Sequence, residues 1–144
     1  MFNETEEVII STDVHKLDIP FIHGFISTSY WGKGRTIEQV GKAIENCFCF
    51  GVYLNNVQIG FARVLTDQVT FAYLMDVFII EEHRGKGYSK RLLEEIFSHT
   101  DFSEVAKWSL ATKDAHGLYK QFEFGEIPEP KRYMERIVRP QWGS

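Results

Sequence analysis

The sequence has few cysteines, no long apolar run and no excess of basic residues, and each absence excludes a class of protein. Its two cysteines, Cys47 and Cys49, are too few for a disulfide-rich fold and supply too few ligands for a metal site. No apolar run is long enough to span a bilayer, and the polar, acidic residues 1–7 lack the pattern of a signal peptide. We therefore expect a cytoplasmic protein with reduced cysteines, no metal and no membrane contact.

Net charge and hydrophobic content limit the possible functions further. The formal net charge is -4, whereas a surface that binds nucleic acid needs a basic excess, so nucleic acid is not an expected partner. Hydrophobic residues make up 44% of the 144 residues, with 12 Phe, 6 Tyr and 3 Trp among them. This composition and length predict one folded domain over residues 1–144 with a substantial core.

Two helices are predicted after a short strand at 8–11. Asp18 supplies an N-cap ahead of apolar residues at helical spacing. Thr36 and Gln39 have the spacing of a capping box, which begins a second helix that ends near Asn46.

Three antiparallel strands are predicted next. Segments 48–54 and 57–65 are strand-like and flank Asn55-Asn56, a pair that tolerates the left-handed backbone of a two-residue hairpin. A further apolar segment, 71–79, follows a second turn. The order so far is strand, helix, helix and three strands.

The last third of the chain alternates between strand and helix. A short strand is predicted from Trp108 to Ala111, and Asp114 is expected to cap the helix that follows. Residues Phe124 to Ile127 look extended, two prolines then interrupt the chain, and Arg132 to Arg139 is predicted to be a closing strand. The whole order predicts an α/β fold.

One stretch, residues 76–93, joins a strand to a helix through a basic loop that contains Gly85 and Gly87. The first turn of a helix has unpaired N–H groups and a partial positive charge, and glycine lets backbone approach an anion closely. The stretch therefore predicts an anion-binding site with a cationic rim made of Arg84, Lys86, Lys90 and Arg91.

Two other phosphate-binding motifs fit this stretch less well. A dinucleotide fingerprint needs a third glycine where Lys90 stands. A Walker loop needs Ser or Thr after Gly85-Lys86, where this chain has Gly87. A nucleotide-binding domain is therefore the least favoured alternative.

Three segments in this order resemble the GCN5-related N-acetyltransferase (GNAT) family. Arg84 to Ser89 is similar to the family's Arg/Gln-x-x-Gly-x-Gly/Ala loop around the pyrophosphate of acetyl-coenzyme A, with Ser89 at the last position. Asp76 to Ile79 is similar to the central strand. Ala115 to Phe124 is similar to the late helix Ala-x-x-Leu-Tyr-x-x-x-Gly-Phe, with Glu123 in place of glycine. The resemblance implies a mixed, strongly twisted α/β sheet of about six to seven strands, flanked by helices.

The resemblance also implies how acetyl-coenzyme A would bind. Backbone N–H groups of the loop would hold the pyrophosphate, and main-chain groups of the central strand would hold the pantetheine like an added strand. The residues expected at this cosubstrate are Val77, Phe78, Ile79, Arg84, Gly85, Lys86, Gly87, Tyr88 and Ser89. The sequence is equally consistent with a Lys86 side chain that binds the cosubstrate and with one that is only a solvated surface charge.

Two catalytic residues are expected. The resemblance implies that Tyr119 donates a proton to the departing thiolate, and the alternative is a core tyrosine whose hydroxyl fills a polar gap. Asp76 would accept the amine proton if burial raises its pKa, or it is an ion-paired structural residue. His83 and His116 are more consistent with surface or packing residues than with a catalytic base. In this family, a water chain can replace a dedicated base.

The acceptor is expected near Tyr30, Trp31, Arg35 and Tyr73. Aromatic walls suit an ammonium substrate, whereas Arg35 would favour a carboxylate, so the two clues point to different acceptors. The loop from Ser27 to Arg35 fits equally well as a solvated connector whose aromatics cover the core edge.

These residues together predict transfer of an acetyl group from acetyl-coenzyme A to a primary amine of a small molecule or peptide. Direct transfer in a ternary complex is favoured, because neither cysteine lies in a nucleophile-like context. The alternative is a non-catalytic acyl-coenzyme A sensor or interaction module, which the departures at Glu123 and Ser89 leave open. An exposed edge at Arg132 to Arg139 would allow a homodimer.

Overall fold

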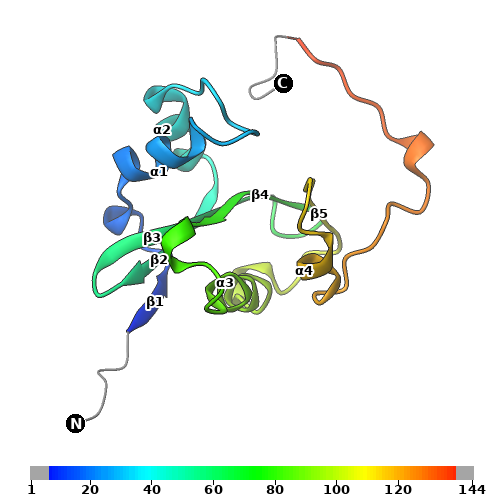
Figure 1. Cartoon of the computed structure of the whole chain (residues 1–144). Coiled ribbons are helices and arrows are strands. Elements are labelled where there is room, and N and C mark those ends of the chain that lie inside the picture. Colours follow the sequence, from blue (N-terminus) through cyan, green and yellow to red (C-terminus); the bar gives the residue numbers. More distant parts are fainter. Residues whose placement is uncertain (1–6, 139–144) are drawn as a thin grey trace.

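The computed structural model describes residues 7–138, which form one five-stranded sheet with helices on both faces (Figure 1). Strands β1 to β4 are antiparallel neighbours in chain order, and β5 pairs parallel with β4. The mixed α/β class is as predicted, but the described residues contain five strands where six or seven were expected. The strands are β1 (Val8–Ser11), β2 (Phe48–Leu54), β3 (Val57–Thr66), β4 (Ala72–Ile79) and β5 (Trp108–Ser109).

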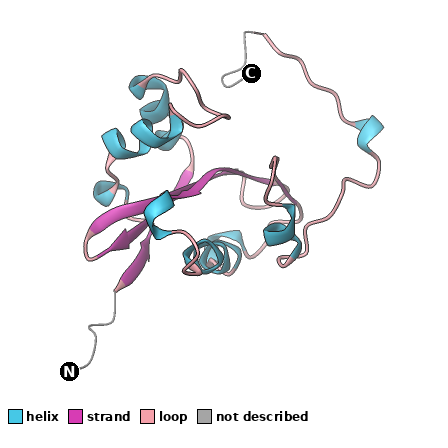
Figure 2. Ribbon diagram, in the orientation of Figure 1, coloured by secondary structure: helices cyan, strands magenta, loops and turns pink. Residues whose placement is uncertain are grey.

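The helices lie in two layers, one on each face of the sheet (Figure 2). Helices α1 (Ile19–Ile26) and α2 (Ile37–Glu45) bury their apolar sides on one face, and α3 (Tyr88–Phe97) and α4 (His116–Lys120) pack on the other. Each layer closes its own hydrophobic core. Four short 3-10 helices complete the description: η1 (Val14–Lys16), η2 (Glu81–His83), η3 (Thr100–Phe102) and η4 (Pro130–Arg132).

The local signals in the first half of the chain are confirmed. The Asp18 side chain accepts a hydrogen bond from the N–H of Phe21 at 3.0 Å, which caps α1. Thr36 and Gln39 exchange both hydrogen bonds of a capping box, at 3.1 and 2.8 Å. Asn55 and Asn56 form the β2–β3 hairpin turn with left-handed φ angles of 51° and 70°. These features depend on neighbours in sequence, so a local pattern suffices to predict them.

The predicted cap of α4 is wrong. Ala115 is the N-cap residue and makes no side-chain capping bond, while its N–H donates to Oγ1 of Thr112 at 3.1 Å. The hydroxyl of Thr112 therefore stabilises this corner in place of Asp114. The strand predicted from Trp108 to Ala111 is present as the two residues of β5.

The two strands predicted near the C-terminus are absent from the described residues. The N–H of Phe124 donates to the Tyr119 carbonyl at 3.2 Å and that of Glu123 to the Lys120 carbonyl at 3.1 Å. This Schellman arrangement ends α4 and turns Phe124 into the core, so residues 124–127 do not enter the sheet. Residues 132–138 join no strand ladder, and Arg139 lies outside the described residues.

A bulge in β4 opens the sheet beside its centre. Phe61 pairs with Phe78 and Arg63 with Met75, so two residues of β4 face the single residue between them on β3. Asp76 occupies the bulge with a left-handed φ of 55°. On the other side of β4, the parallel ladder with β5 contains only Ala72 and Tyr73. Beyond Tyr73, the edge of β4 that faces away from β3 has no strand partner among residues 7–138.

Candidate active site

The predicted anion site is a turn between β4 and α3. The backbone of Gly85 and Gly87 is left-handed, with φ angles of 78° and 82°, and Gly87 is the N-cap of the ten-residue helix α3. A Cβ at either glycine would meet nothing within 4 Å, so the space beside both is open. Gly87 has no side chain to cap the helix, and the first N–H groups of α3 therefore have no side-chain acceptor from their own cap. This geometry suits a phosphate group.

Three of the four basic side chains around this turn, those of Arg84, Lys86 and Arg91, have partners in the domain. Nε of Arg84 donates to the carbonyl of Ile79 at 2.8 Å, which ties the loop to the end of β4. Nη2 of Arg91 donates to the carbonyl of Val8 at 3.3 Å, and Nζ of Lys86 lies 3.4 Å from Nδ1 of His83. Tyr88 is buried in the core, so its side chain anchors the first turn of α3. These contacts preorganise the turn.

The open edge of β4 runs directly into this turn. Val77 is the second residue of the bulge, and Phe78 and Ile79 lie between the bulge and the loop; all three are on the part of β4 that has separated from β5. Because backbone N–H and C=O groups alternate between the two edges of a strand, half of those groups point away from β3. An extended ligand chain can therefore lie beside β4 and reach the glycine turn.

Tyr119 is held by the end of its own helix. Its carbonyl accepts the Phe124 N–H in the Schellman turn, and the two rings meet edge to face with centroids 5.9 Å apart. The residue is 8% exposed, and its hydroxyl has no hydrogen-bond partner among residues 7–138. Burial, and to a smaller extent the neighbouring Tyr30, raise the pKa of Tyr119 to about 12. Tyr119 is thus a protonated phenol with a fixed ring.

The backbone conformation at Glu123 explains how this chain can have glutamate where the helix motif of the GNAT family has glycine. Glu123 occupies the C′ position of the Schellman turn with a left-handed φ of 71°, the conformation that glycine adopts most easily. The backbone of the motif is therefore preserved with a glutamate in place of glycine.

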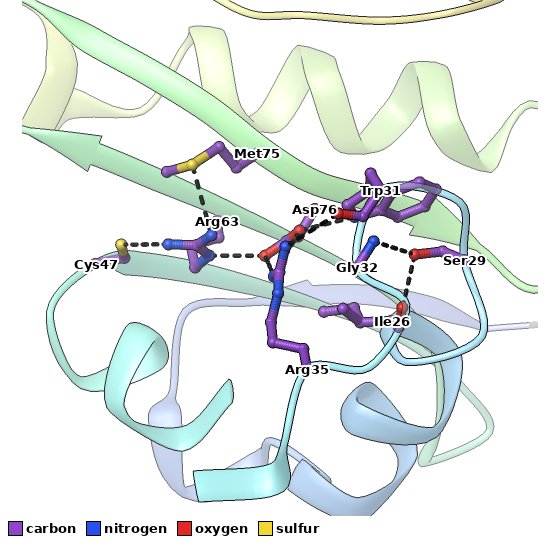
Figure 3. A network of polar contacts seen from close by, with 9 residues as sticks. All are labelled: Ile26, Ser29, Trp31, Gly32, Arg35, Cys47, Arg63, Met75 and Asp76. Carbon is purple, nitrogen blue, oxygen red and sulfur yellow. Dashed lines mark hydrogen bonds and ion pairs between the residues drawn. The ribbon is translucent and has the colours of Figure 1, made fainter. Parts of the chain in front are cut away.

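Asp76 lies in a buried network of polar contacts (Figure 3). Its carboxylate accepts hydrogen bonds from Nε of Arg63 at 2.8 Å, from Nη1 of Arg35 at 3.1 Å and from Nε1 of Trp31 at 2.8 Å. The side chain of Asp76 is 4% exposed and those of both arginines are 12% exposed. This arrangement corresponds to the ion-paired alternative predicted for Asp76.

Arg63 connects this network to a cysteine. Its Nη1 lies 3.3 Å from Sγ of Cys47, and its Nη2 lies 3.5 Å from Sδ of Met75. Burial by itself would lower the pKa of Arg63, but the charge of Asp76 and the hydrogen bonds to Cys47 and Asp76 raise it above its ordinary value. Arg63 therefore stays charged. Arg63 is not among the site residues predicted from the sequence, although a charged residue inside the largely apolar strand β3 is a usable signal.

The loop before α2 is fastened to the end of α1. The Ser29 hydroxyl donates to the carbonyl of Ile26 at 2.6 Å and accepts the N–H of Gly32 at 3.1 Å. A Cβ at Gly32 would come within 2.4 Å of the Ile26 side chain, so only glycine fits at this close approach. The loop thereby presents Trp31 and Arg35 to Asp76 in fixed positions.

Three of the four predicted acceptor residues gather on this loop. Tyr30 packs edge to face on Trp31 with centroids 5.2 Å apart, and Lys113 Nζ lies 5.2 Å from the Tyr30 ring centroid. Lys113, which the sequence analysis did not identify, links this loop to the segment before α4. Tyr73 lies apart from this group, because its ring stacks on Phe71 at 6.3 Å.

Among residues 7–138, no group of three or more His, Cys, Asp or Glu side chains is placed to hold a metal ion. The same residues include no helix with the length and apolar character needed to cross a bilayer.

The fold and the turn at Gly85 and Gly87 define an α/β domain in which an open strand edge leads to a helix N-terminus suited to an anion. The model of the acetyltransferase (GNAT) domain family matches residues 45–126. The chain therefore belongs to the GNAT acetyltransferase family, as the resemblance predicted.

Three relatives show how far the similarity extends. A protein of Xanthomonas campestris pv. campestris that belongs to the GNAT family has 44% identity and a TM-score of 0.89, over 92% of this chain and 94% of that one. A Gibberella zeae protein with a provisional acetyltransferase name is 29% identical over 108 residues, and the match spans 61% of each chain. A Clostridium acetobutylicum protein, described as a predicted acetyltransferase and solved with acetyl-CoA, is 13% identical with a TM-score of 0.68, over 93% of this chain and 97% of that one. At that identity, the last match shows the fold alone.

Proposed function

We propose that this protein transfers an acetyl group from acetyl-coenzyme A to a primary amine of a small molecule or peptide. The observation that carries the proposal is the turn at Gly85 and Gly87, where open space, left-handed backbone and a helix N-terminus coincide at the end of the open β4 edge. A coenzyme A thioester has a pyrophosphate for the turn and a pantetheine arm for the edge. The acetyl-CoA bound by the Clostridium relative of the same fold supports this choice.

The cosubstrate would lie along the open edge of β4 and across the turn at Gly85 and Gly87. The pyrophosphate would accept hydrogen bonds from the backbone of Gly85, Lys86, Gly87, Tyr88 and Ser89, while Val77, Phe78 and Ile79 would pair with the pantetheine. Arg84 would act mainly by fixing the turn, because its Nε already donates to Ile79.

Tyr119 would complete the transfer. The amine nitrogen attacks the thioester carbonyl, the C–S bond breaks, and the departing thiolate takes the phenol proton. A pKa of about 12 keeps this proton in place until the thiolate forms. The amine proton leaves to water, and the phenol regains a proton from solvent.

Asp76 would position the acceptor loop, because two guanidinium groups and an indole already occupy its carboxylate. The general-base role remains the alternative for this residue. Tyr30, Trp31 and Arg35 would form the acceptor wall, with Tyr73 at its margin.

Two observations support direct transfer and the expected compartment. Burial, and then the charge of Cys47, raise the pKa of the Cys49 thiol to about 12, so this thiol is a poor nucleophile for an acyl-enzyme. Both cysteines are free, as in proteins of the reducing cytoplasm, where we place this activity.

The test is to incubate the protein with acetyl-coenzyme A and a panel of primary amines and to follow free thiol release. Amine-dependent thiol release is the expected result. Acetyl-coenzyme A binding without thiol release across the panel would instead identify a sensor or interaction module, and absence of binding would refute the site itself.

A further inference from the structure

A line of side-chain contacts leads from β4 to the segment between β5 and α4. The carboxylate of Asp76 on β4 accepts the Nε1–H of Trp31 at 2.8 Å, and the Trp31 ring meets the Tyr30 ring edge to face at 5.2 Å. Nζ of Lys113 then lies 5.2 Å from the Tyr30 ring centroid. Tyr30 and Lys113 thereby join the loop before α2 to the segment before α4, and these two segments reach toward each other in Figure 1.

The backbone fixes the position of Lys113. Its segment leaves the sheet after β5, which pairs with β4 through only 2 residues. The hydroxyl of Thr112 accepts the N–H of Ala115 at 3.1 Å, and this bond closes the turn that carries Lys113 into α4. The Lys113 side chain is exposed and makes no ion pair with Asp114 or any other carboxylate among residues 7–138. Its ammonium group is therefore available to an anion.

The same contacts bring Lys113 to the end of the domain that holds the proposed proton donor. Tyr119 lies on α4, the helix that follows Lys113 directly. Burial first, and then the Tyr30 phenol, raise the pKa of Tyr119 to about 12, so Tyr30 lies within electrostatic range of that hydroxyl. Tyr30 is 46% exposed, which leaves part of its ring open beside Lys113. A substrate that approaches Tyr119 from this side contacts both groups.

We propose that Lys113 binds a carboxylate of the acceptor, and that the substrate is therefore an amine that also carries a carboxylate. This inference rests on the proposed acetyl transfer and narrows its acceptor. The aromatic ring of Tyr30 would lie against the chain that joins the two groups. Arg35 is less suitable for the carboxylate, because its Nη1 already donates to both oxygens of Asp76, at 3.1 and 3.2 Å.

The charges around Tyr30 favour a carboxylate over an ammonium group. The Asp76 side chain is 4% exposed and already accepts bonds from two guanidinium groups and an indole, so it is not open to a ligand. An acceptor ammonium would meet the positive charge of Lys113 without help from Asp76. A carboxylate forms a charge-assisted hydrogen bond with Lys113 instead. The same cation disfavours protonation of a neighbouring amine, which must be neutral to attack the thioester.

The first experiment measures binding without transfer. The protein is saturated with coenzyme A, which has no acetyl group to give, and is titrated calorimetrically with glycine, β-alanine and γ-aminobutyrate and with the amide of each. An acid and its amide have nearly the same shape and differ in one charge. The wild-type protein should bind at least one acid about fivefold or more tightly than its amide, as expected of a partly exposed ion pair. Glycylglycine and its amide distinguish a peptide acceptor from a free amino acid.

Three variants test whether Lys113 causes this preference. Lys113→Met should bring acid and amide to equal affinity, whereas Lys113→Arg keeps the charge and should keep the preference. Lys33→Met is the matched control, because Lys33 is an exposed lysine on the same loop as Tyr30, and it should also keep the preference. If Lys113 only held Tyr30 in place, its loss would change the affinity for acids and amides alike. Thermal melting should show all three variants folded.

The binding result and the transfer result can fail separately. Equal affinity of acids and amides in the wild-type protein, or no measurable binding of any acid, overturns the proposal even where thiol release shows that the protein acetylates amines. A preference that Lys113→Met retains, or that Lys33→Met loses equally, overturns the assignment to Lys113. Acid-selective binding that Lys113→Met abolishes, without thiol release on any acceptor, supports the carboxylate site and refutes the proposed transfer.

Discussion

Nε of Arg63 donates a hydrogen bond to Oδ2 of Asp76 over 2.8 Å, next to the bulge where β4 shifts its register against β3. Arg35, from the loop before α2, meets the same oxygen at 3.1 Å. One carboxylate thus fastens the α1–α2 layer to the strand that leads to the glycine turn. The bulge is what allows this, because it turns Asp76 toward that layer.

Replacing Asp76 with Asn should lower the free energy of unfolding by about 3 kcal/mol. Two largely buried guanidinium groups lose the negative charge of Asp76, and removing one partner of a buried pair is strongly destabilising. Asn tolerates the left-handed φ of 55°, so the change reports on charge and not on backbone strain. Urea unfolding measures the effect, with the exposed Asp114→Asn as the control expected to change little.

Kinetics on the same variant separate the two roles of Asp76. A positioning role predicts a higher KM for the amine with the shape of the pH profile retained. A general-base role predicts a lower kcat and loss of the acidic limb of that profile, a result that would restore the sequence-based hypothesis.

Tyr119→Phe should lower kcat about 100-fold while the affinity for acetyl-coenzyme A stays within about twofold, because only the proposed proton donor is removed. The matched control is Tyr53→Phe. Tyr53 is also buried, its hydroxyl has no hydrogen-bond partner, and burial followed by the charges of Asp13 and Asp18 raises its pKa to about 12. Steady-state thiol release and calorimetric binding measure the two quantities. Undiminished turnover in Tyr119→Phe would refute the donor role.

The raised pKa of Tyr119 predicts the alkaline behaviour of the enzyme. A group that must be protonated to act loses activity as the pH passes its pKa, so a pKa of about 12 leaves Tyr119 active throughout the measurable range. The rate should rise as the acceptor amine deprotonates and should not fall up to about pH 10, where an ordinary tyrosine with a pKa of about 10 would be half ionised. A profile of kcat from about pH 6 to pH 10 checks this. A fall above about pH 9 that disappears in Tyr119→Phe would contradict it.

Gly87→Ala should weaken coenzyme A binding about tenfold. The left-handed φ of 82° costs an L-residue roughly 1–2 kcal/mol, and the new Cβ would occupy the open space assigned to the pyrophosphate. Gly41→Ala is the control, since Gly41 lies inside α2 with nothing within 4 Å of a Cβ, and alanine there should stabilise by about 0.5–1 kcal/mol. Calorimetry and thermal melting distinguish the two effects. Unchanged affinity in Gly87→Ala would exclude this turn as the pyrophosphate site.

Glu123→Gly should stabilise the domain by about 1 kcal/mol. Glu123 has a left-handed backbone at the end of α4, and glycine adopts that conformation without steric cost. The neighbouring Gln121 has an ordinary φ of -66°, so Gln121→Gly should instead destabilise by about 0.5–1 kcal/mol. Chemical unfolding of both variants measures the difference. If both lowered the stability equally, the account of the Schellman turn would be wrong.

Much of the fold could be predicted because its signals are local. The capping box at Thr36 and the hairpin at Asn55-Asn56 are set by residues within four positions of each other, and the structure contains both. The strand predicted at residues 124–127 is absent for a related reason. These residues look extended in isolation, but the hydrogen bond from the Phe124 N–H to the Tyr119 carbonyl closes a turn that keeps their backbone out of the sheet.

The sequence by itself determined the order of elements, the glycine turn before α3 and the tyrosine on α4, because each is a short pattern of neighbouring residues. Only the tertiary structure decided what surrounds Asp76. Arg63 lies 13 residues away from it along the chain, Arg35 41 residues and Trp31 45 residues, and a bulge in β4 brings them together. Contacts over such distances depend on how the two layers pack on the sheet, which no local pattern encodes. The exposure of Tyr133, Met134 and Ile137 likewise depends on the tertiary structure, because only the folded domain decides which apolar side chains it buries.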